Sequence, residues 1–146
     1  FHPHPANPAP LWSRGLGDVY KRQTFNLLNR VEKEDLSIIA TGAMDFLGNK
    51  FSSKFGIQDC IATKTEVINN KISGRLDGLP NFGSDKKANV EEWCKRKNIS
   101  KEEIIFYTDS INDFPLVKLS AQNVIVCPDD KLEKFAQENK LEIIYR

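Results

Sequence analysis

The sequence has 146 residues, of which 40% are hydrophobic and 28% are charged, and its formal net charge is +1. This composition is typical of one globular domain with its own core, and the charge balance gives no electrostatic reason to expect binding to nucleic acid or to an anionic membrane. Three scattered cysteines without C-x-x-C spacing are expected to be reduced thiols in a cytoplasmic protein. No apolar run approaches the ~20 residues of a membrane-spanning helix, so no membrane span is expected.

The first 23 residues are expected to lie outside the folded domain. Residues 1–10 include four prolines and no hydrophobic period, which is typical of an extended or disordered segment. Residues 13–23, SRGLGDVYKRQ, resemble translated adapter or vector sequence. We therefore expect residues 1–23 to be disordered or non-native, and residues 24–146 to form part of a domain whose N-terminal portion has been lost.

Hydrophobic periodicity predicts strands that alternate with helices along most of the chain. In chain order the pattern predicts a helix at Thr24–Lys33, a strand at Leu36–Ala40, a helix at Phe46–Phe55, a strand at Cys60–Thr63, a hairpin of Glu66–Asn69 with Lys71–Arg75, a helix at Asp85–Lys97, a capping box of Ser100 with Glu103, a strand at Ile104–Thr108, a helix at Asn112–Leu119 with Asn112 as its cap, a strand at Asn123–Val126, a helix capped by Asp129, and a strand at Leu141–Tyr145. Alternation of this kind predicts an α/β fold with a parallel sheet.

Thr41, Gly42 and Ala43 follow the first predicted strand. Ligands of open α/β sheets bind at the carboxyl ends of the strands, and a hydroxyl group beside free backbone N–H groups suits phosphate oxygens. A Thr-Gly turn can equally be structural, so this segment alone leaves both interpretations open.

A second polar group, Asp109-Ser110-Ile111-Asn112-Asp113, follows the predicted strand at Ile104–Thr108. Two carboxylates four residues apart can converge on one point, and hard oxygen ligands of this kind suit Mg²⁺. The alternative is that Asn112 and Asp113 only cap the next helix.

Lys86 lies at the start of the predicted helix Asp85–Lys97. Steps of about 100° per residue place Lys86 about 30° from the centre of the apolar stripe and Lys87 about 70° from it. A charge on the core-facing stripe is unexpected and indicates a functional lysine, although a lysine that extends along the surface to reach solvent would fit as well.

Taken together, these motifs resemble the haloacid dehalogenase superfamily, subfamily IB, the group that includes phosphoserine phosphatase. The resemblance rests on four segments in order: IIATGAMDFLGNKFSSKFGIQDCIAT, EVINNKISGRLDG, GSDKKANVEEW and YTDSINDFPLV. It implies a Rossmann-like three-layer core with a small antiparallel hairpin, Mg²⁺ as cofactor and a small phosphomonoester as substrate.

The resemblance also implies a role for each matching residue. Thr41 and the Gly42 amide would hold the phosphoryl group, and Lys86 would neutralise charge between nucleophile and phosphate. Asp109 would bind Mg²⁺ with Asp113 in support, and Asn112 would assist phosphate contacts. The family attacks phosphorus with an aspartate and hydrolyses the resulting aspartyl phosphate.

The family's first motif, D-x-D-x-T, is not found in the 146 residues. The resemblance would place its strand at the centre of the sheet, between the strands at Leu36–Ala40 and Ile104–Thr108, and the substrate-selecting cap would lie between the first and second motifs. The chain is therefore expected to be the C-terminal part of a phosphatase and inactive alone. The alternative is a non-catalytic phosphate- or metal-binding module. The sequence indicates neither the particular substrate nor the oligomeric state.

Overall fold

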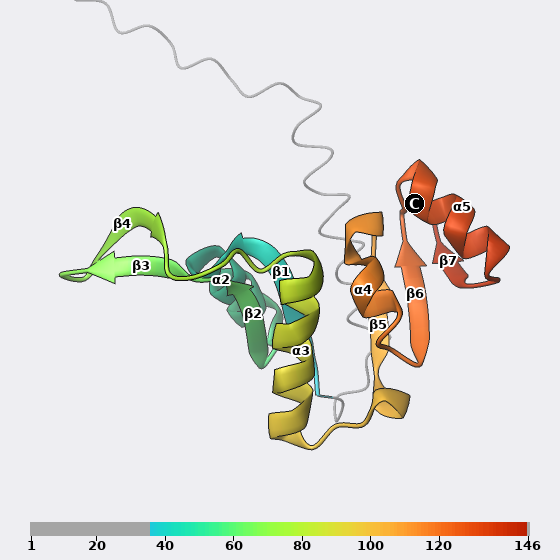
Figure 1. Cartoon of the computed structure of the whole chain (residues 1–146), viewed down its shortest axis with the longest axis horizontal. Coiled ribbons are helices and arrows are strands. Elements are labelled where there is room, and N and C mark those ends of the chain that lie inside the picture. The colour runs from blue at the N-terminus through green and yellow to red at the C-terminus, as the bar shows by residue number, and fades with distance from the viewer. Residues whose placement is uncertain (1–35, 146) are drawn as a thin grey trace, which may run out of the picture. The chain divides into compact units, whose positions relative to one another are not determined.

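The computed structural model describes residues 36–145, in which strands and helices alternate (Figure 1). The predicted disordered segment 1–23 and the predicted helix at Thr24–Lys33 lie outside the described residues. The elements, in order, are β1 (Ile38–Met44), α2 (Asp45–Phe55), β2 (Asp59–Thr63), β3 (Thr65–Ile68), β4 (Lys71–Leu76), α3 (Gly83–Lys97), a 3₁₀ turn η1 (Lys101–Glu103), β5 (Ile105–Thr108), a 3₁₀ turn η2 (Ile111–Asp113), α4 (Phe114–Val117), β6 (Gln122–Val126), α5 (Asp130–Glu138) and β7 (Glu142–Ile144). None of these helices combines the length and apolar character needed to cross a membrane.

The parallel strands form two separate sheets rather than one. β1 pairs with β2, and β5, β6 and β7 form a second sheet in that order. The predicted parallel α/β class is therefore confirmed. Among the described strands, β1 pairs only with β2, and β5 pairs only with β6. The resemblance placed a central strand between β1 and β5, and that placement stays a prediction.

The hairpin of β3 and β4 is the one antiparallel pair in the described part of the chain. Asn69 and Asn70 connect its strands with φ of 51° and 61°, the left-handed conformation that a two-residue hairpin turn requires at both central positions. All six residues of β4 are exposed, and the hairpin projects away from α3 (Figure 1). The predicted projecting hairpin is confirmed.

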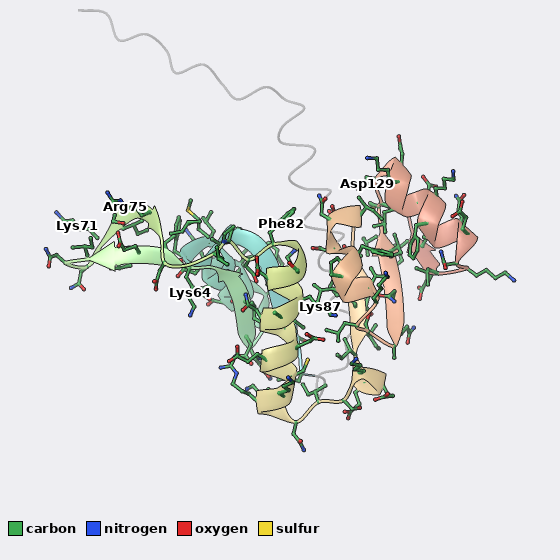
Figure 2. All side chains as sticks on the ribbon, in the orientation of Figure 1. Lys64, Lys71, Arg75, Phe82, Lys87 and Asp129 are labelled. Atoms are coloured by element: carbon green, nitrogen blue, oxygen red, sulfur yellow. The ribbon has the colours of Figure 1, made fainter. Side chains whose placement is uncertain are left out.

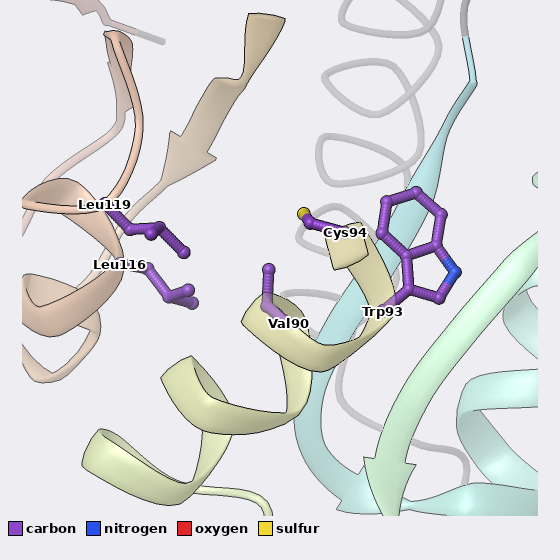
Figure 3. Packing of buried hydrophobic residues seen from close by; sticks show 5 residues of the cluster. All are labelled: Val90, Trp93, Cys94, Leu116 and Leu119. Atoms are coloured by element: carbon purple, nitrogen blue, oxygen red, sulfur yellow. The ribbon is translucent and has the colours of Figure 1, made fainter. Parts of the chain in front are cut away.

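The main core lies against α3, whose buried face meets side chains from both sheets. Figure 3 shows Val90 of α3 pointing toward Leu116 and Leu119, with Cys94 beside it. Partly buried side chains from both sheets and from nearby loops pack against the same cluster: Ile38, Ala40, Ile61, Ile99, Ile104 and Phe106. The helix α3 therefore lies against β1 and β2, and the cluster that it shares with Leu116 and Leu119 also takes in Phe106 of β5.

Two predicted local features were wrong. The first strand continues to Met44 instead of ending at Ala40, because the chain remains extended through an irregular stretch beside β2. The predicted helix at Asn112–Leu119 is a 3₁₀ turn followed by the four-residue α4. Asn112 is not its cap, since the hydroxyl of Ser110 accepts the Asn112 N–H at 3.3 Å. The capping box of Ser100 with Glu103 and the cap by Asp129 are confirmed.

Candidate phosphate and metal site

Thr41, Gly42 and Ala43 form the irregular stretch of β1. The Ala43 N–H donates to Thr41 Oγ1 at 3.1 Å, which turns the Thr41 side chain along its own backbone. Thr41 is half-buried, and Gly42 and Ala43 are exposed. The predicted turn after a strand is therefore a distortion within the strand, and it still presents a hydroxyl group and an exposed glycine.

Asn81, which sequence reasoning placed only in a loop, holds this stretch from behind. It is 1% exposed, and its Nδ2 donates to the carbonyl oxygens of Thr41 at 2.8 Å and of Ile61 at 3.0 Å. Its backbone N–H donates to Thr63 Oγ1 at 3.0 Å, and the Thr63 hydroxyl donates to the Gly42 carbonyl at 2.8 Å. A single asparagine in GLPNFG carries no local signal for such a role, because its partners lie 18 to 40 residues away.

Lys86 lies in the first turn of α3 and is buried, with 6% of its surface exposed. Its Nζ contacts Asp113 Oδ1 at 2.5 Å in an ion pair. The neighbouring Lys87 instead makes a loose 3.6 Å pair with Glu91, with more than a third of each side chain exposed. The helical-wheel placement of Lys86 on the inward face is confirmed, and its role in charge neutralisation stays a prediction.

Asp109 and Asp113 differ sharply in their surroundings. Asp109 is exposed directly after β5, as is Asn112 within η2. Asp113 accepts from Lys86 on one oxygen and from the Thr108 hydroxyl on the other, at 3.3 Å. Both Asp113 oxygens thus accept from protein donors, one from Lys86 and one from Thr108. Asp109, by contrast, is exposed to solvent.

Asp129 is a further acidic residue at this loop, and the sequence identified it only as a helix cap. Its Oδ1 accepts the Leu132 N–H at 2.8 Å, and its Oδ2 accepts the Ile111 N–H at 3.3 Å. Its own N–H donates to the Asp109 carbonyl at 3.3 Å. The Leu132 N–H, followed by that of Ile111, holds the pKa of Asp129 below its usual range. Asp129, at the start of α5 in Figure 2, therefore fastens the acidic loop to the following helix.

The N-terminal end of α3 joins these parts. Asn81 and Phe82 precede the helix, and a side chain added at Gly42 would meet the Asn81 carbonyl oxygen at 3.5 Å and the Phe82 ring at 3.6 Å. The Lys86 N–H donates to the Phe82 carbonyl at 3.3 Å, and the Lys86 side chain reaches Asp113. The phosphate-binding candidate Gly42 and the acidic loop thus meet the same helix end. Within residues 36–145, no hydrogen bond links Thr41 directly to Lys86 or Asp109.

The described residues include carboxylates but no complete group of metal ligands. No group of three or more His, Cys, Asp or Glu side chains that could hold a metal occurs in residues 36–145. Asp109 is exposed, and Asp113 is already paired with Lys86. Mg²⁺ keeps several waters and commonly takes one or two protein carboxylates with substrate phosphate, so this donor set fits a shared Mg²⁺ site.

A family model described as haloacid dehalogenase-like hydrolase matches residues 13–118. The chain belongs to the haloacid dehalogenase-like hydrolases. The match begins at residue 13, inside the segment 1–23 that is expected to lie outside the domain, so the boundary between residues 23 and 24 stays a prediction.

Relatives of this haloacid dehalogenase-like chain include phosphatases. This chain is 29% identical over 108 residues to a histidinol-phosphatase of Neisseria meningitidis, and the aligned region covers 71% of this chain and 49% of that protein. The chain spans about half the length, or less, of the curated relatives it matches.

Solved structures share the fold. A protein of unknown function from Bordetella pertussis aligns with a TM-score of 0.76 and 24% identity, over 93% of this chain and 67% of that one. A phospho-aspartyl intermediate analogue of phosphoserine phosphatase aligns with a TM-score of 0.60 and 22% identity, over 83% of this chain and 55% of that one. These likenesses support the predicted Rossmann-like fold.

Proposed function

We propose that this chain is the C-terminal part of a Mg²⁺-dependent phosphomonoesterase that works through an aspartyl-phosphate intermediate, with the nucleophilic aspartate supplied by sequence outside these 146 residues. The observation that carries the proposal is the buried Lys86, paired with Asp113 at the helix end that also meets Gly42. A buried cation paired with an acidic loop, on a helix whose start lies near an exposed backbone stretch, suits a phosphoryl group and its metal.

Each residue has a proposed role. The Gly42 amide and the Thr41 hydroxyl bind phosphoryl oxygens, and Lys86 Nζ neutralises charge between the phosphate and the attacking carboxylate. Asp109, with its exposed carboxylate, faces the metal, which supplies charge stabilisation on the phosphate oxygens when bound. Asp113 fixes Lys86 and supports the metal site, and the exposed Asn112 contacts substrate.

The proposed reaction has two displacements at phosphorus. A carboxylate oxygen of the nucleophile forms a bond to phosphorus while the ester P–O bond breaks, and the departing oxygen takes up a proton. A water molecule then attacks the phosphorus of the aspartyl phosphate, which regenerates the carboxylate and releases inorganic phosphate. The residues of this chain contribute positioning and electrostatic stabilisation in both steps.

A second candidate function is a non-catalytic phosphate- or metal-binding module, which the lack of any D-x-D in the sequence favours. Both candidates share the phosphate site and differ in turnover.

We further propose a small phosphomonoester as the substrate and the cytoplasm as the compartment. Burial raises the pKa of the Cys60 and Cys94 thiols, which keeps them protonated and poorly reactive, as suits reduced thiols in that compartment.

The deciding experiment compares phosphate release by the 146-residue chain with release by a longer protein that includes the reading frame upstream of the Thr24 codon. We expect the short chain to show no turnover of phosphoserine, histidinol phosphate or p-nitrophenyl phosphate, with or without Mg²⁺. We expect Mg²⁺-dependent turnover from the longer protein if that frame encodes D-x-D-x-T. Robust turnover by the short chain would contradict the proposal. An upstream frame without D-x-D-x-T would favour the non-catalytic module.

Lys86 and Lys87 provide a matched pair of variants in the active form. Lys86→Met should lower kcat/KM by roughly 100-fold or more, because removal of one preorganised charge or donor typically costs that much. Lys87→Met alters the exposed neighbour on the same helix and should leave kcat/KM within about twofold. Equal losses from the two substitutions would remove Lys86 from the proposed site.

A further inference from the structure

The pairing of β1 with β2 has two extra residues on the β1 side. Ala40 lies opposite Ile61 and Met44 opposite Thr63, so β1 advances four residues while β2 advances two. The residues between Ala40 and Met44 therefore leave the regular ladder, and their backbone groups lose the partners that a regular strand would give them. Something outside the two strands must satisfy those groups.

The side-chain amide of Asn81 does so for the Thr41 carbonyl, from a fully buried position. One nitrogen, Nδ2, donates to one carbonyl of each strand, that of Thr41 in β1 and that of Ile61 in β2. The Asn81 Oδ1 accepts from Asn89 Nδ2 at 2.9 Å, so the amide oxygen faces α3 while the nitrogen faces the two strands.

These bonds also decide where the next N–H groups point. The Thr41 carbonyl is held by Asn81, and the Gly42 carbonyl is held by the Thr63 hydroxyl, which itself accepts the Asn81 N–H. Consecutive carbonyls of a regular strand point in opposite directions, whereas here both are drawn to partners around Asn81. Because a trans peptide is planar with N–H opposite C=O, the N–H groups of Gly42 and Ala43 are directed away from those partners. The Ala43 N–H donates to Thr41 Oγ1 at 3.1 Å, so the Gly42 N–H is the backbone donor that we assign to an anion.

We propose that Asn81 is the positioning residue of the phosphate site: its side-chain amide fixes the distorted stretch of β1 so that the Gly42 N–H group faces a phosphoryl oxygen. This inference rests on the proposed function for its ligand. Asn81 acts through the backbone of Thr41 and Gly42, and is not itself a phosphate ligand.

The test uses the 146-residue chain, labelled with ¹⁵N, and inorganic phosphate as the probe. Phosphate should shift the Gly42 and Ala43 amide resonances of the wild type. Asn81→Asp replaces the donating nitrogen with an accepting oxygen at constant shape. Its carboxylate repels the Thr41 carbonyl that the amide held, so the Gly42 N–H is no longer fixed and phosphate binding should weaken about tenfold or more at neutral pH. The control Asn89→Ala leaves both bonds from Asn81 Nδ2 to the strand carbonyls in place, so the backbone at Gly42 stays held and the affinity should change less than about threefold.

A pH series with sulfate, whose charge stays constant, separates positioning from packing. The carboxyl group that Asn81→Asp introduces can donate one hydrogen bond once it is protonated, so sulfate binding by this variant should recover as the pH falls, relative to the wild type. If Asn81→Asp does not fold, Asn89→Asp tests the inference instead. Its carboxylate repels the Asn81 side-chain oxygen and favours an Asn81 amide rotated so that the oxygen faces the strands. Asn89→Asp should therefore weaken phosphate binding, whereas Asn89→Ala should not.

The two hypotheses fail in different ways. Absence of phosphate-dependent shifts in the wild type would remove the proposed phosphate site. The positioning role would then be judged from ligand-free spectra, in which Asn81→Asp should move the Gly42 and Ala43 resonances and Asn89→Ala should not. The inference would be overturned if the wild type binds phosphate but the Gly42 and Ala43 resonances stay unmoved in folded Asn81→Asp. If Asn81→Asp does not fold, the same result in Asn89→Asp would overturn it.

Discussion

The ion pair between Lys86 and Asp113 should dominate the response of this chain to loss of a single charge. The Lys86 side chain is 7% exposed and that of Asp113 is 16% exposed, so Asp113→Asn leaves a cation with little access to water. Removal of one partner from a fully buried pair costs about 3–5 kcal/mol. Because Asp113 retains some solvent contact and asparagine can still accept one hydrogen bond, we expect about 2–3 kcal/mol. That is a large share of the roughly 5–15 kcal/mol by which a domain is stable.

Urea denaturation, followed by circular dichroism, measures this cost as a change in the free energy of unfolding. Glu91→Gln is the matched control, because it breaks the exposed pair with Lys87 on the same helix; it should cost no more than about 0.2–1 kcal/mol. The double variant Lys86→Met with Asp113→Asn should be less destabilised than the sum of the single changes, since the second substitution removes the charge that the first leaves unpaired. If Asp113→Asn costs no more than Glu91→Gln, the burial argument is wrong.

Two further predictions concern other parts of the described chain. The pKa of Asp129 lies below its ordinary 3.8 in the folded state. The stabilising effect of the ionised Asp129 is therefore complete above pH 3.8 and is lost as the pH falls through the lowered pKa. Asp129→Asn should reduce this loss of stability at acid pH, measured by urea unfolding at a series of pH values, and an unchanged pH profile would contradict the capping role. A methyl group at Gly48 would lie 2.7 Å from Cys60 Sγ, so Gly48→Ala should lower stability in thermal unfolding by about 1 kcal/mol despite the better helix propensity. Adding Cys60→Ala in the Gly48→Ala background should recover most of that loss, and no recovery would place the strain elsewhere.

Local periodicity was sufficient to predict most of the elements in residues 36–145 and the inward face of α3. A helix repeats every 3.6 residues regardless of its neighbours, so the sequence distinguishes Lys86 from Lys87 without knowledge of tertiary contacts. The Asn69–Asn70 turn was readable for the same reason, because left-handed turn residues are a local requirement. The cap by Asp129 was likewise a local pattern.

Contacts between distant segments could not be predicted in this way. The end of β1 depends on Asn81, which is 40 residues beyond Thr41, and no property of the Thr41–Gly42 dipeptide indicates that the strand continues through it. The pairing of Asp113 with Lys86 spans 27 residues, so reasoning from the sequence alone assigned both carboxylates to the metal. The second bond of Asp129, to Ile111, spans 18 residues and changes a helix cap into a clamp on the acidic loop.

The N-terminal end of α3 explains how site parts on two separate sheets can act together. Asn81, just before the helix, holds β1 and β2, whereas Lys86, one turn into it, holds the loop after β5. Val90, one turn further, packs with the core cluster that both sheets share. A shift of the helix along its axis would therefore alter the backbone around Gly42 and the ion pair at Asp113 at once. Substitution of Asn81 should impair the part of the site around Gly42, and substitution of Lys86 should impair the part around Asp113. The two losses of phosphate-binding free energy should therefore be additive only if neither substitution moves the N-terminal end of α3.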